Sequence, residues 1–369
     1  MLGLNQIELD RNERIGLSGP APVGRPWFHF SFSGLNYTHE GTGLLPVVSA
    51  AQVRDFGKTV GRARAREGLF PLAFGWYSTR NLTTEETMLA LMSILPADTV
   101  MAGESAGLLY GIEARPASSY QQPFRLCVAR PEGNRAIRRP GVRCRILKFE
   151  PGDLVRRYGI RCTSALRTAL DMSLGASLDV ATHVLETFVR RGWITKADLE
   201  ERVALMRGWR GIRVLREAIR LMDSRSESFF ETSVRIRLFE AGLPAPTPQV
   251  PVKVPHRLAP FRLDFGWLES GGNAVNLGLE CDSSKYHPLT GEKADADRLR
   301  REEIERQGWR VMSVRYSELR GPKMTFEREV AKWLKRPLFV SERRPWSISR
   351  WQRLRNAWVR QDYQPIVLG

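Results

Sequence analysis

Apolar residues recur at intervals of three and four along the middle of the chain, which is the pattern of helices that bury one face. The pattern predicts helices at residues 163–173, 178–192, 196–206 and 211–223, and two further helices are expected before them, at 85–95 and 100–112. Two extended segments lie among them, at 123–130 and 141–149, and the basic Gly/Pro segment between them indicates a hairpin turn. We therefore expect residues 82–223 to form an α+β middle domain.

The pattern changes near residue 224. A helix is predicted at 228–243, and apolar strands punctuated by Pro and Gly follow at 244–255, 259–269 and 274–282. A strongly charged helix at 292–308 and a last strand at 309–319 complete the order α-β-β-β-α-β. Residues 224–320 are thus expected to form a mixed α/β domain.

The first 81 residues divide into two parts. Residues 1–45 hold Gly, Pro and isolated aromatics without periodicity, so we expect a loose arm. In 46–81 a short helix, a basic helix and a strand-turn-strand follow one another, the outline of a winged helix-turn-helix. Its second helix would enter the DNA major groove, which makes Arg62, Arg64 and Arg66 candidate DNA contacts. The alternative is that these arginines only solvate the helix.

The last segment, residues 321–369, interleaves arginines with tryptophans. Trp351 and Trp358 are seven residues apart, which suits one helical face. We expect a basic, aromatic helical tail. Its aromatic stripe either packs on the preceding domain or forms a platform for nucleic-acid bases.

The charge balance favours a polyanionic partner. The chain has 57 Lys and Arg against 40 Asp and Glu, a net charge of +17, and most of its cations are arginine. Neutralising phosphates releases condensed counterions, so such an excess favours DNA, with duplex DNA expected first. An arginine-rich but merely solvated surface remains the alternative.

Cysteine spacing and hydropathy exclude other classes. Four widely spaced cysteines, at positions 127, 144, 162 and 281, contain no C-x-x-C pair, which argues against structural zinc and disulfides. No apolar run reaches the roughly 20 residues that span a bilayer, and the N-terminus lacks the apolar core of a secretion signal. We expect a cytoplasmic protein without a membrane partner.

Acidic residues within the predicted apolar strands carry the candidate chemistry. Asp264 and Glu280 lie on strands that the intervening Gly-Gly-Asn turn makes neighbours, and Asp282 shares the face of Glu280 by the period of two. Buried carboxylates are costly unless they are neutralised, and Mg²⁺ or Mn²⁺ does so through carboxylate oxygens. Asp264 and Glu280 are therefore the candidate metal ligands for phosphodiester hydrolysis.

Three further residues are candidates with plain alternatives. His287 follows the strand of Glu280 and could assist a proton transfer, or be an ordinary loop histidine. Lys285 could contact phosphate or only balance charge. Glu231 completes a capping box with Ser228, which explains it without any catalytic role, although a helix-borne carboxylate can also reach a metal.

The residues also resemble a known family. Residues 226–314 resemble the Vsr-like endonuclease-fold domains of the PD-(D/E)XK superfamily. The layout of residues 46–320, including 105–112 and 162–173, resembles bacterial or phage AbiEi-type antitoxins with an appended endonuclease-like domain. This resemblance implies a restriction-endonuclease-like fold for the C-terminal domain.

The resemblance also assigns residues. It implies that the family's first acid is Asp264, its second is Glu280 and its helix glutamate is Glu231. The lysine found two residues after the second acid in much of the superfamily is here Asp282, as is common in Vsr-like relatives. A paired histidine is reduced to Tyr-His, ending in His287. The missing lysine favours a regulator over an enzyme, whereas the intact pair of Asp264 and Glu280 favours the enzyme.

Two functions are therefore expected from the sequence. The first is a DNA-binding protein with an Mg²⁺-dependent endonuclease domain, acting in phage defence or DNA processing. The second is an AbiEi-type antitoxin and transcriptional autoregulator with a catalytically silent nuclease fold, with a toxin protein as a further partner.

Overall fold

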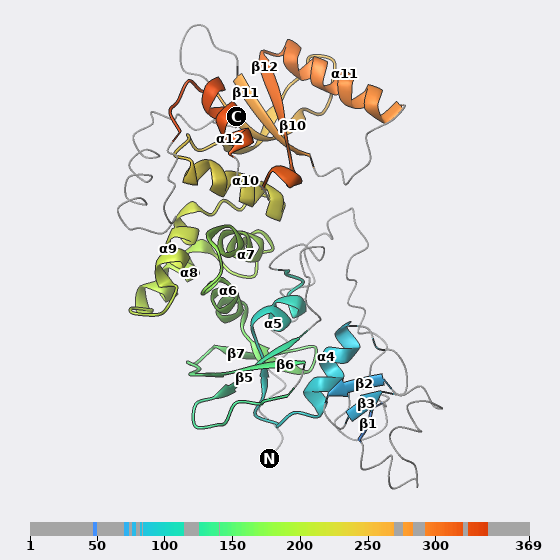
Figure 1. The fold of residues 1–369 in the computed structure, drawn as a ribbon, viewed down its shortest axis with the longest axis vertical. Helices are drawn as coiled ribbons and strands as arrows, with labels where there is room; N and C mark the ends of the chain where they lie inside the picture. The colour runs from blue at the N-terminus through green and yellow to red at the C-terminus, as the bar shows by residue number, and fades with distance from the viewer. Residues whose placement is uncertain are drawn as a thin grey trace. The chain divides into compact units, whose positions relative to one another are not determined.

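The computed structural model describes residues 47–49, 70–73, 76–78, 82, 84–113, 125–139, 141–268, 276–282, 292–319 and 324–338. The chain divides into two compact units, Met1–Met172 and Ser173–Gly369 (Figure 1). The expected arm, both helices of the expected winged unit and the tryptophan-rich stretch of the tail lie outside the described residues. So do Arg62, Arg64, Arg66, Lys285 and His287.

The first unit contains two sheets. The smaller sheet has the order β1-β3-β2 with antiparallel pairs. Its strands are β1 (Val47–Ser49), β2 (Phe70–Ala73) and β3 (Trp76–Ser78). The strand-turn-strand predicted at the end of the winged unit is therefore confirmed, while the winged helix itself stays a prediction.

The larger sheet of this unit is mixed, with the order β6-β5-β4-β8-β7. Its strands are β4 (Val100–Met101), β5 (Leu126–Pro131), β6 (Val142–Leu147), β7 (Leu154–Arg157) and β8 (Ile160–Thr163). The helices among the described residues of this unit are α4 (Thr84–Ser93), α5 (Gly103–Leu109) and α6 (Ala165–Ser173), the last of which ends at the boundary. Buried side chains of α4 and α5, such as Leu91 and Leu109, form one core with Met101, Leu126 and Cys162 of this sheet.

The predicted hairpin between residues 123 and 149 is wrong. β5 and β6 pair in parallel, from Leu126–Val142 to Pro131–Leu147. The connection between the two strands turns twice, with positive-φ glycines at Gly133 and Gly141. It thereby returns the chain to the level of the start of β5, where β6 begins. Alternating apolar residues predict a strand but not its direction, and a connection of this length can span six extended residues.

The second unit begins with helices at the predicted places. They are α7 (Leu178–Arg190), α8 (Lys196–Leu205), α9 (Ile212–Leu221) and α10 (Phe229–Glu240). A capping box starts α8, in which Thr195 Oγ1 accepts from the N–H of Asp198 and the Asp198 carboxylate accepts from the N–H of Thr195. The amphipathic pattern of these helices is thus confirmed as helical structure.

A four-stranded sheet follows, with the order β12-β11-β10-β9. Its elements are β9 (Thr247–Val252), β10 (Phe261–Trp267), β11 (Asn276–Asp282), α11 (Glu292–Arg306) and β12 (Trp309–Arg315), followed by a 3₁₀ turn (Tyr316–Leu319) and α12 (Thr325–Trp333). Only β11 and β12 are parallel; the other neighbours are antiparallel. The predicted order α-β-β-β-α-β is confirmed, and both units are mixed α/β.

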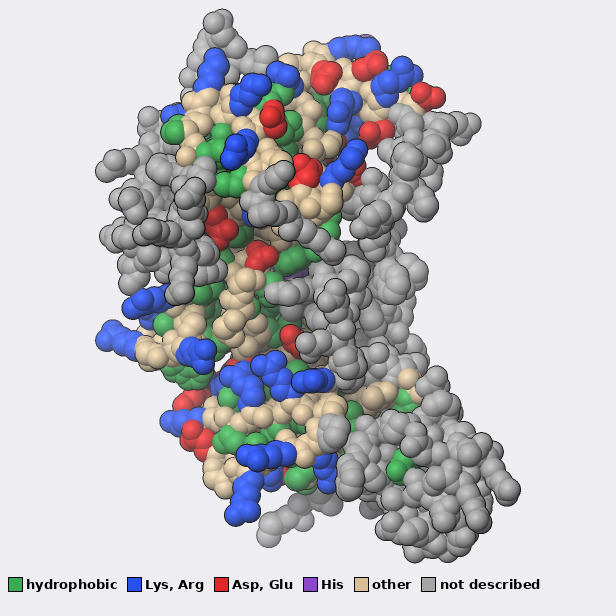
Figure 2. Space-filling model, in the orientation of Figure 1, with side chains coloured by type: hydrophobic (Ala, Val, Ile, Leu, Met, Phe, Trp, Pro, Cys, Tyr) green, Lys and Arg blue, Asp and Glu red, His purple; other side chains and the backbone are tan. Residues whose placement is uncertain are grey.

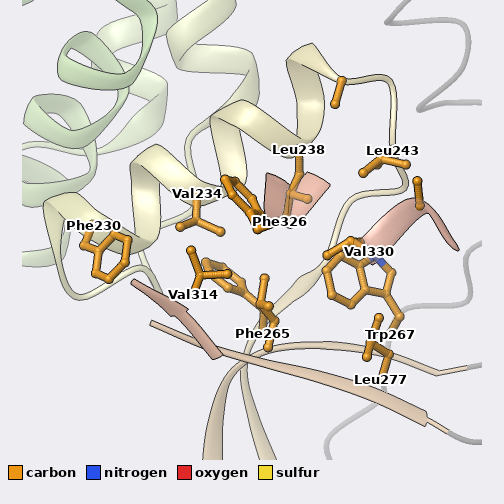
Figure 3. Packing of buried hydrophobic residues seen from close by; sticks show 13 residues of the cluster. Phe230, Val234, Leu238, Leu243, Phe265, Trp267, Leu277, Val314, Phe326 and Val330 are labelled. Atoms are coloured by element: carbon orange, nitrogen blue, oxygen red, sulfur yellow. The ribbon is translucent and has the colours of Figure 1, made fainter. Parts of the chain in front are cut away.

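Two apolar clusters flank this sheet. On one face Val234 and Leu238 of α10 and Phe326 of α12 pack with Phe265 and Val314 of the strands (Figure 3). A second cluster joins Ile304 of α11 to residues of three of the strands, β9, β10 and β12: Val250, Val252, Phe261, Leu263, Trp309 and Val311. Helices α10 and α12 therefore cover the sheet at one cluster, and α11 covers it at the other. The polar side chains of the strands must lie outside these two apolar clusters. No helix among the described residues is long and apolar enough to cross a bilayer.

Candidate functional site

Asp264 lies where the pleat of β10 is interrupted. In a regular strand Leu263 and Phe265 would face the same side, but Leu263 packs in the α11 cluster and Phe265 in the α10 cluster. β10 and β11 pair from Trp267–Leu277 to Phe265–Leu279. One residue further, Asp264 Oδ2 accepts the N–H of Cys281 at 2.7 Å. The carboxylate thus replaces a backbone acceptor at the point where the ladder between the strands ends.

The strand on the other side of β10 is irregular at the same level. Leu263 pairs with Val250 and Phe265 with Pro248, so Gln249 lies opposite Asp264. Gln249 has φ 56°, the left-handed region that a side chain other than glycine rarely occupies. Such strain is kept only where surrounding contacts over-determine it, and it gathers at functional sites.

Carboxylates are crowded around Asp264. Burial raises the pKa of Asp264 from 3.8 to about 6; the N–H of Cys281 opposes this, and the negative charges of Glu231 and Glu280 add to it. Burial and the same three acids also raise the pKa of the Cys281 thiol. The sequence predicted that Asp264 and Glu280 would converge, and in the structure both lie close to Cys281.

Glu280 is neutralised by a residue that sequence reasoning missed. Arg300 Nη2 lies 2.6 Å from Glu280 Oε1, and the exposed fractions of the two side chains are 31% and 18%. The same nitrogen donates to the carbonyl of Arg262 at 3.1 Å, and the guanidinium stands 5.5 Å from the Phe261 ring centre. In the sequence Arg300 is one of many charges in a charged helix, so nothing there singles it out.

Glu231 lies in the first turn of α10 and also reaches toward the sheet. Ser228 Oγ accepts from the N–H of Glu231 and donates to its Oε1, while Oε2 accepts from the N–H of Glu227. Gln249 Nε2 donates to the same Oε2 at 2.8 Å. Glu231 therefore has the capping contact and also lies beside the residue opposite Asp264. Because its Nε2 faces a carboxylate, Gln249 turns Oε1 elsewhere, and this buried oxygen has no hydrogen-bond partner among the described residues.

The remaining candidates are less well defined. Asp282 ends β11, two residues beyond Glu280, and is level with Arg315 of β12. The assignments of Lys285 and His287 stay predictions, because both lie outside the described residues. Within the described part of the chain, no three His, Cys, Asp or Glu side chains are grouped closely enough to hold a metal ion.

A basic cavity lies elsewhere in the second unit, between α8 and α9. It measures about 670 Å³, with Val203, Ala204 and Ile219 as its apolar lining. Its charged lining comprises Lys196, Arg207, Arg216, Arg220 and Glu200. Figure 2 shows Lys and Arg side chains around the tip of these helices. A concave surface lined mainly by one sign of charge concentrates counter-ions, here anions.

Comparison with known proteins gives two relatives and no activity. The chain is similar to two uncharacterized proteins of Mycobacterium tuberculosis, from strains CDC 1551 and H37Rv, each 28% identical over 167 residues. The match covers 45% of this chain and 59% of each relative, so the chain spans about three fifths of the length of these relatives. No family model matches the chain.

Proposed function

We propose that residues 224–320, within the second unit, form a metal-dependent endonuclease domain of the Vsr-like, restriction-endonuclease-like type, and that Asp264 and Glu280 bind Mg²⁺ or Mn²⁺. The main support is the crowding at the end of the β10–β11 ladder, where burial and two neighbouring carboxylates raise the pKa of Asp264. A carboxyl group that is partly buried beside two other acids is a group whose ionised form a bound cation would stabilise. Mg²⁺ needs only one or two carboxylates, so the donors fit it.

The residues of the chain then have separate tasks. A bound cation would polarise the scissile phosphate and lower the pKa of a water molecule. Asp264 is held in place by the N–H of Cys281, so its carboxylate is pre-positioned. Glu231, fixed by Ser228 and Gln249, adds negative charge that favours cation binding.

Asp282 tunes the site, and His287 or Lys285 orients water or phosphate. Duplex DNA docks on Arg62, Arg64 and Arg66.

The test uses supercoiled plasmid, with purified full-length chain and Mg²⁺ or Mn²⁺. We expect nicking by the wild type and loss of at least two orders of magnitude in Asp264→Ala and Glu280→Ala, since each removes a metal ligand. Both variants should still bind DNA. Equal nicking by all three proteins would reject the assignment and indicate a contaminating nuclease.

The second candidate function is an AbiEi-type antitoxin that represses its own promoter and binds a toxin protein, with the nuclease fold as a scaffold. The observation in its favour is the ion pair between Arg300 and Glu280, which neutralises one of the two proposed ligands without a metal. Sequence-specific gel shifts on promoter DNA, without cleavage in any divalent cation, would favour this function over the first.

A further inference from the structure

Arg300 connects three parts of the proposed site. It extends from α11 to Glu280 on β11, to the Arg262 carbonyl on β10 and to the Phe261 ring. Two other arginines of α11 pair within the helix, Arg298 with Asp295 and Arg306 with Glu302, and both are about two-thirds exposed. Arg300 is partly buried and reaches across to the sheet; Arg301 is also partly buried and donates to Ser313 Oγ of β12.

The charges around Arg300 keep it there. Burial lowers the pKa of its guanidinium, but the hydrogen bond and charge of Glu280, with Asp297 and Asp264, raise it by more. Arg300 thus supplies positive charge at the place where the cation would supply it. A guanidinium 2.6 Å from Glu280 Oε1 and a divalent cation on the same carboxylate would repel one another strongly. The two are therefore alternatives for Glu280.

A displaced guanidinium would need an anion. Its planar donors match phosphate oxygens in a bidentate way, and this geometry makes arginine a common phosphate-binding residue. Phosphate is also the group that the bound cation attracts to the same place. The exchange leaves no charge uncompensated: the cation takes Glu280, and the DNA phosphate takes Arg300.

We propose that Arg300 holds Glu280 in the metal-free protein and transfers to a DNA phosphate when a divalent cation takes that carboxylate. The inference rests on the proposed endonuclease function and adds a regulation of its site: cation and DNA bind cooperatively, because each favours the same position of Arg300. Arg300 is then a substrate-binding residue, and in the metal-free protein its side chain occupies the place of the cation at Glu280.

The first measurement is Mn²⁺ affinity of the metal-stripped full chain, by electron paramagnetic resonance or calorimetry, without DNA. Arg300→Gln should bind Mn²⁺ about tenfold more tightly than the wild type, because no guanidinium competes for Glu280. Arg300→Lys keeps a competing charge and should change the affinity far less. Arg298→Gln removes a charge from the same helix and should stay within about twofold. Unchanged or weaker Mn²⁺ binding by Arg300→Gln would overturn the proposal.

The second measurement is duplex DNA binding by fluorescence anisotropy, in Ca²⁺ and in EDTA. Arg300→Gln should weaken binding several-fold in Ca²⁺ but leave it unchanged in EDTA, where the wild-type guanidinium is still held by Glu280. Equal weakening in both buffers would contradict the exchange. Thermal unfolding checks that each variant is folded.

Asp264→Ala separates this inference from the function on which it depends. If wild-type Mn²⁺ binding does not depend on Asp264, the endonuclease proposal and this inference both fail. If it does depend on Asp264 and Arg300→Gln still has no effect, only the role of Arg300 fails.

Discussion

Asp264 is a carboxyl group in a place where its charge is costly. It is partly buried at the end of a strand ladder, one of its oxygens accepts the N–H of Cys281, and Glu231 and Glu280 are close enough to raise its pKa. Because proteins are only marginally stable, a partly buried carboxylate beside two other acids should measurably lower the free energy of unfolding. The cost should appear as a pH dependence of the free energy of unfolding.

Asp264→Asn should reveal that dependence. With a pKa of about 6 when folded and 3.8 as its ordinary value, the wild-type group adds a stabilisation that is fully present below 3.8 and lost as the pH rises through about 6. The amide does not titrate and can still accept from Cys281. The free energy of unfolding of the variant, measured relative to that of the wild type, should therefore rise by on the order of 2 kcal/mol between about pH 4 and about pH 7.

Urea unfolding at those two pH values, in EDTA, gives the measurement. Asp282→Asn, for a neighbouring acid at the end of the same sheet, is the control. A stability difference between Asp264→Asn and the wild type that stays constant with pH would show that the pKa of Asp264 is the same in the folded and unfolded states, and would contradict the prediction.

The sequence singles out some of these residues and not others for a physical reason. Asp264 and Glu280 interrupt apolar strands, and an acid in such a place is visible in one dimension. Arg300 and Gln249 owe their interest to partners that the fold brings from other elements, Glu280 on β11 and Glu231 on α10. Their neighbours in the chain do not distinguish them. The strain at Gln249 is a backbone property with no signature in its residue type.

Elements were predictable where they depend on local chemistry. The capping contact predicted between Ser228 and Glu231 is present at the start of α10, and the amphipathic helices begin and end near their predicted limits. The direction of β6 was not predictable, because strand direction depends on which neighbour completes the core. β5 is buried along Leu126–Ala129 and accepts β6 in parallel at one edge, after a connection that turns twice.

Two helix starts in the second unit form a matched pair. Thr195 caps α8 through its side chain, whereas Ser177 stands at the start of α7 without a side-chain capping bond. Thr195→Ala should therefore cost about 1 kcal/mol of unfolding free energy, since a helix N–H loses its acceptor. Ser177→Ala should cost a few tenths of a kcal/mol at most. Urea titrations of both variants measure the difference, and equal losses would mean that the box contributes nothing beyond helix propensity.

At the scale of the whole molecule, the net charge of +17 suits contact with a polyanion, and the cavity between α8 and α9 is one place where described cations gather. If DNA phosphates bind there, Lys196→Ala/Arg207→Ala should weaken duplex binding and flatten the slope of log affinity against log salt by roughly 1 to 2. Arg298→Ala/Arg306→Ala removes the same charge from α11 and is the control. Identical slopes for the two double variants would assign the effect to net charge alone.

The large sheet of the first unit ends at β6, and none of the described strands pairs with the outer side of that strand. Such an edge is a template on which a second copy of a chain can add a strand. Arg143 and Arg145 are exposed along β6, and Ile146 beside them is 37% exposed. Two copies approaching edge to edge would bring equal guanidinium groups together. Repulsion between these arginines therefore disfavours the association of two copies through this edge of the sheet.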